Sequence, residues 1–329
     1  MNRLLLCLML VLLPASARAD DGASMRFLRK ADAAFTAHQI RIARVELMNA
    51  TDADRRNVLA WLYRAKVALA LGRGIEADNA LDDAIRAGAR ETATYHYRAH
   101  ALLLEGKPEA ALKMAEASRI PWPWRGYAAR MRGRALAELG DFRGAQAEFD
   151  AALALMPRNA ALWEDIARAR LLAADRAGAI EAARRAAVFD PKRVSALVFN
   201  GVLVRAQYGL RAALPWFDRA LAIDSLDIDA LLERAATLGE LGRYRAMLET
   251  TRKVLANDPG NARAYYLQAV LAARARDFKL AGALIDLADD TIGDAPGMLL
   301  LKGIVALTDN VPQRAQDALG ALVEMQPDN

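Results

Sequence analysis

Residues 126–159 read GYAARMRGRALAELGDFRGAQAEFDAALALMPRN, and this stretch decides the fold. Gly140 marks a turn between two helices, because a left-handed residue ends the first of them. Small residues such as Gly133 and Ala145 alternate with large ones such as Phe149, which is typical of helices whose backbones approach closely. Pro157 follows the second helix. The stretch therefore predicts a unit of helix A, turn and helix B.

The same residue types return every 34 residues from Ser24 to Asn329 with no insertion between the copies. Such a period is the signature of a helical repeat array. Residues 20–23 form a short lead. The array divides into nine blocks, each numbered here from position 1: 24–57, 58–91, 92–125, 126–159, 160–193, 194–227, 228–261, 262–295 and 296–329.

Small and large residues alternate along the whole array. All nine blocks carry alanine or glycine at position 8, and positions 20 and 27 are small in most blocks. Such residues let two helix backbones approach closely. The large residues at positions 4 and 24 are Phe27, Trp61, Tyr95, Trp163 and Tyr265, and Leu47, Leu81, Phe149, Phe217 and Ile285.

These marks resemble the tetratricopeptide repeat family, which has small residues at positions 8, 20 and 27, aromatic residues at 4 and 24, and proline at 32. The resemblance covers residues 24–329. It implies an all-α fold, an α-solenoid in which nine helix-turn-helix units form a right-handed superhelix. It also implies that helix A lines a concave surface, chiefly with positions 2, 5, 9, 12 and 13.

Those positions define a candidate partner-binding groove that is apolar at its ends and cationic at its centre. It would suit an extended or helical peptide with acidic residues between apolar anchors, and it would also accept an anionic glycan. Alternatively, the arginines are solvated and paired with acids such as Glu138, Glu164 and Glu240. The predicted groove residues are Leu28, Leu62, His96, His100, Arg130, Arg134, Arg168, Arg205, Leu300 and Ile304.

Position 7 departs from the family pattern, because it is basic in six blocks where leucine is usual. The residues could form a basic ladder along the array. Alternatively, their stems cover apolar surface while their charged ends meet helix-B acids such as Asp82, Glu116 or Asp150. The six are Lys30, Arg64, Arg98, Arg132, Arg234 and Lys302.

Two blocks are irregular. Pro121 should end helix B of block 92–125 early, and the neighbouring Trp122 and Trp124 either staple adjacent blocks or form an exposed aromatic contact. Block 228–261 has Met247, Thr251 and Val254 at positions 20, 24 and 27. It should be the softest seam of the array, able to open locally.

Nothing in the sequence indicates catalysis, a cofactor or a metal. His96 and His100 lie four residues apart but lack the glutamate of a zinc protease motif, and Arg130 and Arg134 would repel a cation. No phosphate-binding or nucleophile motif occurs, and His38 falls at a predicted turn. The formal charge of +5 becomes +3 without Arg3 and Arg18 of the leader, too weak an excess to imply nucleic acid.

Residues 1–19 predict a cleaved export leader rather than part of the fold. Arg3 is followed by ten apolar residues, Leu4 to Leu13, and by an Ala17-Arg18-Ala19 cleavage site. Ten residues are too few to span a bilayer. The single cysteine, Cys7, lies within that stretch, so the exported chain would hold none. We expect a periplasmic or secreted protein.

The array ends without a polar capping helix, since Pro327 to Asn329 stand where another block would begin. Leu319 and Leu322 would then face solvent, further repeats, another copy of the chain or a docked partner. The leader and helix-B segments such as Arg41 to Ala50 are similar to exported bacterial tetratricopeptide proteins of exopolysaccharide and exosortase systems. The expected function is a non-catalytic scaffold for an envelope protein. Binding of an acidic polysaccharide and a purely structural spacer remain the alternatives.

Overall fold

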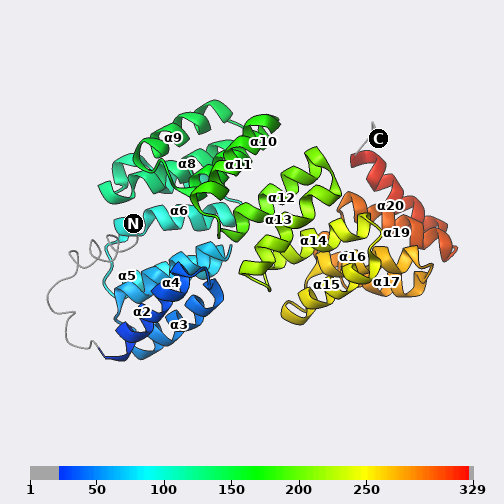
Figure 1. Ribbon diagram of the computed structural model, residues 1–329, viewed down its shortest axis with the longest axis horizontal. Coiled ribbons are helices and arrows are strands. Elements are labelled where there is room, and N and C mark those ends of the chain that lie inside the picture. The colour runs from blue at the N-terminus through cyan, green and yellow to red at the C-terminus, as the bar shows by residue number, and fades with distance from the viewer. Residues whose placement is uncertain (1–21, 326–329) are drawn as a thin grey trace. The chain divides into compact units, whose positions relative to one another are not determined.

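The computed structural model describes residues 22–325, in which every regular element is a helix (Figure 1). Two compact units are described separately: unit 1 ends at Ala196 and unit 2 begins at Leu197. The predicted leader with Cys7, and residues 326–329, lie outside the described residues. None of the described helices is both long and apolar enough to cross a bilayer.

Unit 1 holds the helices of the first five blocks, in pairs of A and B helices that pack against each other. The pairs are α2 (Ala23–Thr36) and α3 (Ile40–Ala53), α4 (Val58–Ala70) and α5 (Gly74–Arg86), α6 (Tyr95–Leu104) and α7 (Pro108–Met114), α8 (Arg125–Glu138) and α9 (Phe142–Leu155), and α10 (Ala160–Leu172) and α11 (Arg176–Phe189).

Unit 2 continues the same arrangement after α12, whose first residues belong to unit 1. The predicted all-α fold of helix pairs is confirmed. The helices are α12 (Val194–Tyr208), α13 (Leu210–Ile223), α14 (Ile228–Glu240), α15 (Tyr244–Asn257), α16 (Ala262–Arg274), α17 (Phe278–Asp286), α18 (Asp289–Ile292), α19 (Pro296–Thr308) and α20 (Pro312–Met325).

The turn between helix A and helix B is left-handed, as the sequence predicts. Gly140 has a φ of 83° at position 15, a conformation that glycine adopts without steric penalty. Four blocks that lack this glycine still place a left-handed residue there, with φ of 60° at His38 and 56° at Asn310, and similar values at Ala174 and Arg276. Block 194–227 differs, because α12 includes position 15 and the left-handed residue is Gly209 at position 16.

Side-chain caps fix where the helices begin, a signal that the block pattern alone does not show. Asn159 at position 34 accepts a hydrogen bond from the Leu162 amide at the start of α10. Asp141 at position 16 accepts one from the Gly144 amide at the start of α9. Each cap satisfies an amide that has no partner within the helix.

Helix A and helix B meet at the predicted small and large residues. Phe149 of α9 is buried against Gly133 of α8, where a Cβ atom would lie 2.6 Å from the ring. Phe217 of α13 meets Gly201 of α12 in the same way, since a Cβ atom at Gly201 would lie 2.4 Å from the Phe217 ring. The close approach of the two helices thus depends on a missing side chain.

Block 92–125 is irregular in the way that Pro121 predicts. Helix α7 has seven residues, and the rest of the segment forms the 3-10 turns η3 (Ala117–Arg119) and η4 (Trp122–Trp124). The two tryptophans take both of the predicted roles. Trp124 packs against the core of the third and fourth blocks, whereas Trp122 is 72% exposed.

Block 228–261 fills its irregular seam with polar contacts. Met247, Thr251 and Val254 are all buried. The Thr251 hydroxyl donates to the Leu248 carbonyl and accepts a hydrogen bond from the Gln268 amide of the next block. The softness of this seam stays a prediction.

Replacing Gly133 with alanine should destabilise the array. The added Cβ would force the Phe149 ring to move, and overpacking of about 1–3 kcal/mol should outweigh a helix-propensity gain of about 1 kcal/mol. Gly320→Ala in α20 is the control, because nothing lies within 4 Å of that position, and it should stabilise. Urea unfolding measures both, and Phe149→Leu should partly rescue Gly133→Ala. A neutral Gly133→Ala would show that the contact is not tight.

Candidate functional site

The predicted groove residues of unit 1 lie on its five successive A helices, α2, α4, α6, α8 and α10. Leu28, Leu62 and Arg130 are buried, and His96 has no exposed surface at all. These four side chains therefore do not offer the partner contacts that the sequence suggests. Arg134 is 19% exposed, whereas Arg168 is 51% exposed.

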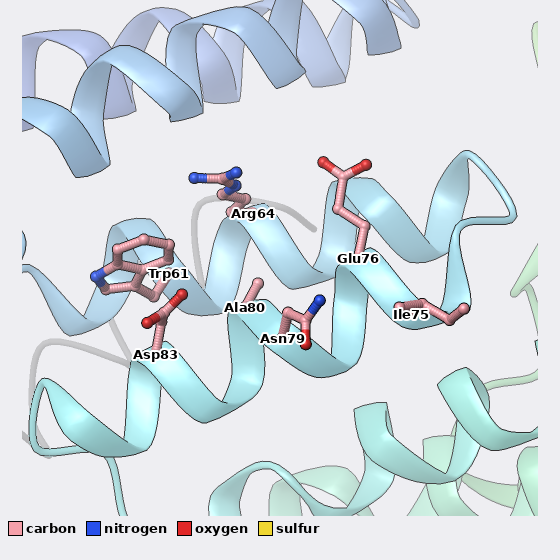
Figure 2. A pocket seen from close by; sticks show the side chains of 7 residues that line it. All are labelled: Trp61, Arg64, Ile75, Glu76, Asn79, Ala80 and Asp83. Carbon is pink, nitrogen blue, oxygen red and sulfur yellow. The ribbon is translucent and has the colours of Figure 1, made fainter.

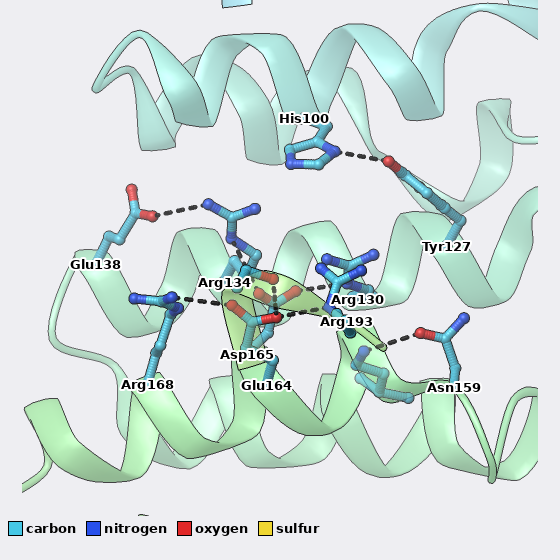
Figure 3. A network of polar contacts seen from close by, with 12 residues as sticks. His100, Tyr127, Arg130, Arg134, Glu138, Asn159, Glu164, Asp165, Arg168 and Arg193 are labelled. Atoms are coloured by element: carbon cyan, nitrogen blue, oxygen red, sulfur yellow. Dashed lines mark hydrogen bonds and ion pairs between the residues drawn. The ribbon is translucent and has the colours of Figure 1, made fainter. Parts of the chain in front are cut away.

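Arg130 belongs to an internal ion pair. Its Nε donates to Asp165 Oδ2 on α10 at 2.5 Å, and both residues are buried (Figure 3). The guanidinium also lies 5.5 Å from the centre of the Tyr127 ring. Burying a charge is costly unless it is paired and hydrogen-bonded, so this contact joins two A helices and leaves little of Arg130 for a ligand.

Glu164 is the acid that holds Arg168. Its carboxylate accepts hydrogen bonds from Arg168 at 2.9 Å, from Arg193 at 2.7 Å and from the Ser195 hydroxyl at 2.9 Å. Burial raises the pKa of Glu164, but the two arginines outweigh burial and lower that pKa to about 2. The predicted alternative, in which groove arginines pair with acids, is confirmed for Arg168 and Glu164.

Arg134 is held more loosely than Arg130. Its closest acidic atoms are Asp165 Oδ1 at 3.7 Å and Glu138 Oε1 at 3.9 Å, and both distances exceed a hydrogen bond. In Figure 3 its guanidinium reaches from α8 toward Glu138 and the side of His100. Arg134 and the half-exposed Arg168 are thus the predicted arginines of unit 1 that an incoming anion can reach.

The two histidines are part of the interior. His100 Nδ1 lies 2.6 Å from the Tyr127 hydroxyl, and burial together with the charges of Arg134, Arg130 and Arg193 lowers the pKa of His100. His96 stacks on Trp124 with ring centres 4.3 Å apart. Neither ring nitrogen of His96 has a hydrogen-bond partner, and burial lowers its pKa to about 3.

The predicted groove residues of unit 2 also include both paired and exposed side chains. Arg205 of α12 pairs with Glu233 of α14 at 2.7 Å, and Arg263 of α16 reaches the other oxygen of Glu233 at 2.5 Å. By contrast, Leu300 and Ile304 of α19 are 48% and 41% exposed. Arg205, the predicted charged groove residue of unit 2, is therefore engaged in an internal ion pair, whereas the predicted apolar residues Leu300 and Ile304 are exposed.

Comparison with known proteins identifies the repeat. The tetratricopeptide repeat family profile matches residues 130–194 and 232–296. Helix pairs throughout the described chain follow the same block pattern. The chain is a tetratricopeptide repeat protein. No curated protein matches it.

Two solved structures show the same fold. The anaphase-promoting complex hetero-tetramer Cut9-Hcn1 has a TM-score of 0.72 at 14% identity, over 95% of this chain and 61% of that one. PilW, described as a widely conserved type IV pilus biogenesis factor, has a TM-score of 0.53 at 19% identity, over 62% of this chain and 95% of that one. At these identities the likeness concerns the tetratricopeptide fold alone.

Four of the six basic residues at position 7 of these tetratricopeptide repeats, Arg64, Arg98, Arg132 and Arg234, bond to side chains of B helices. Arg98 pairs with Asp82, as the sequence suggests, and with Asp78. Arg132 bonds Glu148 at 2.6 Å and the Ala115 carbonyl at 2.8 Å. The other two suggested acids bond elsewhere, Glu116 to Ser118 and Asp150 to Gln146.

Sequence reasoning missed Asp165 and Glu233, the acids that hold Arg130 and Arg205. Both stand at position 6, where several other tetratricopeptide repeats of this chain carry an apolar residue such as Met131. A lone acid at an apolar position, close in register to an arginine of the neighbouring repeat, is the signal that could have found them.

A pocket of about 250 Å³ lies between α4 and α5 (Figure 2). Its charged groups already have partners. Glu76 binds Arg44 at 3.0 Å, and Asp83 binds Arg86 at 2.5 Å. We therefore do not assign it a ligand. The lining residues are Trp61, Arg64, Ile75, Glu76, Asn79, Ala80 and Asp83.

Removing Asp165 should destabilise the protein strongly. Asp165→Leu leaves the Arg130 guanidinium buried without its carboxylate, a loss expected at about 3–5 kcal/mol. The double variant Asp165→Leu/Arg130→Met removes both charges and should recover most of that loss. Denaturant unfolding compares the three proteins. A single variant as stable as the parent would show that the pair is not desolvated.

Acid should weaken the fold through His96. Above pH 6.5 the ring is neutral in the folded and unfolded chains, so it contributes no pH dependence. Below pH 6.5 the unfolded chain binds a proton that the folded chain excludes down to about pH 3, so stability falls with pH. At pH 5 the loss is about 2 kcal/mol.

The variant His96→Phe keeps a ring on Trp124 and removes the titrating group. Its free energy of unfolding, measured in urea at pH 7 and pH 5, should change less than that of the parent protein. Equal changes in the two proteins would rule out His96 as a source of the acid sensitivity.

Proposed function

We propose that this protein is a non-catalytic scaffold of the bacterial cell envelope that binds an acidic segment of a partner protein along the A helices of unit 1. Tetratricopeptide repeats generally mediate protein–protein interaction. The envelope location is supported by the leader-like pattern of residues 1–19. Protein binding is thus expected from the fold, whereas the ligand chemistry is argued from the site.

Arg134 carries the proposal. It is a guanidinium on helix A with two acids at 3.7 Å and 3.9 Å but neither within hydrogen-bond distance. A carboxylate from a partner can form the two parallel hydrogen bonds that a guanidinium prefers. Arg168 lies on the adjacent A helix, half exposed, and can receive a second acidic group beside its bond to Glu164.

Unit 2 carries an exposed apolar surface of its own. Leu300, Ile304 and Leu307 follow a helical spacing on α19, and all three are exposed. Exposed apolar side chains at such a spacing are typical of a surface that binds an amphipathic segment. Unit 2 by itself therefore offers candidate contacts for an apolar stretch on α19.

Removing the two arginine charges should weaken partner binding. In-cell crosslinking of the full chain with mass spectrometry identifies the partner, and crosslinks are expected on α8 and α10. Arg134→Gln/Arg168→Gln should lower recovery of that partner by about tenfold or more, since each arginine makes a charge-assisted contact.

The matched control is Arg143→Gln/Arg184→Gln, which removes two exposed arginine charges from B helices of the same unit. Recovery should remain at the parent level. Titration with poly-L-glutamate and with alginate compares a peptide and a glycan polyanion. Preference for alginate would favour the polysaccharide alternative, and unchanged recovery with the Arg134 and Arg168 variant would reject the site.

A further inference from the structure

Lys66 is a cation that the groove prediction did not include. It stands on α4 with its Nζ atom 4.5 Å from the centre of the Phe35 ring and 4.7 Å from the centre of the Tyr63 ring. The two rings come from α2 and α4 and are 5.8 Å apart. The ammonium therefore lies against two aromatic faces contributed by two successive repeats.

The Lys66 ammonium forms no ion pair with the described residues. Among the described residues no carboxylate oxygen lies within 4.0 Å of Nζ. The acid that faces it, Asp32, accepts a hydrogen bond from the Tyr63 hydroxyl at 2.6 Å. Burial lowers the pKa of Lys66, while the charge of Asp32 acts in the opposite direction.

The absence of an ion pair at Lys66 contrasts with three of the groove arginines. Arg130, Arg168 and Arg205 each hold a carboxylate of the protein within 2.9 Å. An ammonium group has three donors and no acceptor, and a partly desolvated one gains most from an added anion. Lys66 is thus a partly buried basic side chain on an A helix of unit 1 for which no ion pair within the described part of the protein offsets the charge.

The register of Lys66 places it in line with the proposed site. Position 9 is occupied by Lys66, His100, Arg134 and Arg168 in four successive repeats of unit 1. Equivalent positions on neighbouring A helices form a row across the stack. A segment bound at Arg134 and Arg168 that continues toward α4 would reach Lys66.

We propose that Lys66, whose ammonium lies against the Phe35 and Tyr63 rings, binds a carboxylate on an apolar stretch of the partner. The inference rests on the proposed function and adds a second anchor to it. The aromatic walls, with the partly exposed Leu59 on the same helix, favour an acidic residue beside apolar side chains over a hydrated sugar acid.

Small carboxylates test the anchor without the partner. Reductive methylation with ¹³C-formaldehyde labels every lysine and keeps its charge. The Lys66 signal, assigned with Lys66→Met, should lie upfield because of the two rings. N-acetyl-leucine should shift it saturably, and glucuronate should do so about tenfold more weakly, a difference of about 1.4 kcal/mol.

Lys30 is the internal control, because it lies 5.5 Å from the Phe27 ring but is exposed and stands at position 7. A response of Lys66 no stronger than that of Lys30 would overturn the inference. A stronger response to glucuronate would also overturn it, in favour of a sugar acid.

Measuring partner recovery with separate Lys66 and arginine variants tests this inference independently of the proposed function. Lys66→Met should lower recovery of the crosslinked partner by about tenfold, and Lys30→Met should not. If recovery depends on Arg134 and Arg168 but not on Lys66, only the inference fails. If Lys66 binds N-acetyl-leucine while the arginine variant recovers the partner normally, the inference survives as a carboxylate site and the arginine site fails.

Discussion

The close contact between small residues of helix A and large residues of helix B is the constraint on which the rest of the structure depends. At Gly133 the Phe149 ring occupies the space that any side chain would need. Each helix pair is thereby held at one spacing, and the pairs stack in the same register. The A helices then present the same positions, 5, 9 and 12, at regular intervals, which is what makes a row of functional side chains possible.

Charge pairs within that row decide which side chains remain available. Asp165 and Glu233 neutralise arginines of the neighbouring repeats, and Glu164 binds Arg168 and Arg193. Ion pairs within the protein thus engage three of the four arginines predicted for the groove, Arg130, Arg168 and Arg205. The basic side chains proposed for a partner are the half-exposed Arg168 and the two with loose or missing carboxylate contacts, Arg134 and Lys66.

The architecture was predictable because its determinants are local. The left-handed turn, the small residues and the terminal prolines act within one 34-residue block, and each recurs at the same position. The availability of single side chains was not predictable in this way. Arg130 and Arg134 stand four residues apart on one helix, yet Asp165 of another repeat pairs closely with the first and only loosely with the second.

His96 shows the same limit from another cause. Its position in the block is one that faces the groove in the family, but the 3-10 turn that replaces the end of helix B places Trp124 on its ring. The proline that shortens α7 was visible in the sequence. The path of the chain after that helix depends on tertiary packing, which the block pattern does not encode.

The ion pairs that cross repeat boundaries have a consequence for how such an array can change. Glu233 of the seventh repeat joins Arg205 of the sixth to Arg263 of the eighth. Excising the seventh repeat would preserve the steric fit of the remaining helices but strand two guanidinium groups without their shared counter-ion. The repeats are therefore alike in shape but not interchangeable, because a repeat such as the seventh supplies the carboxylate that pairs with arginines of both its neighbours.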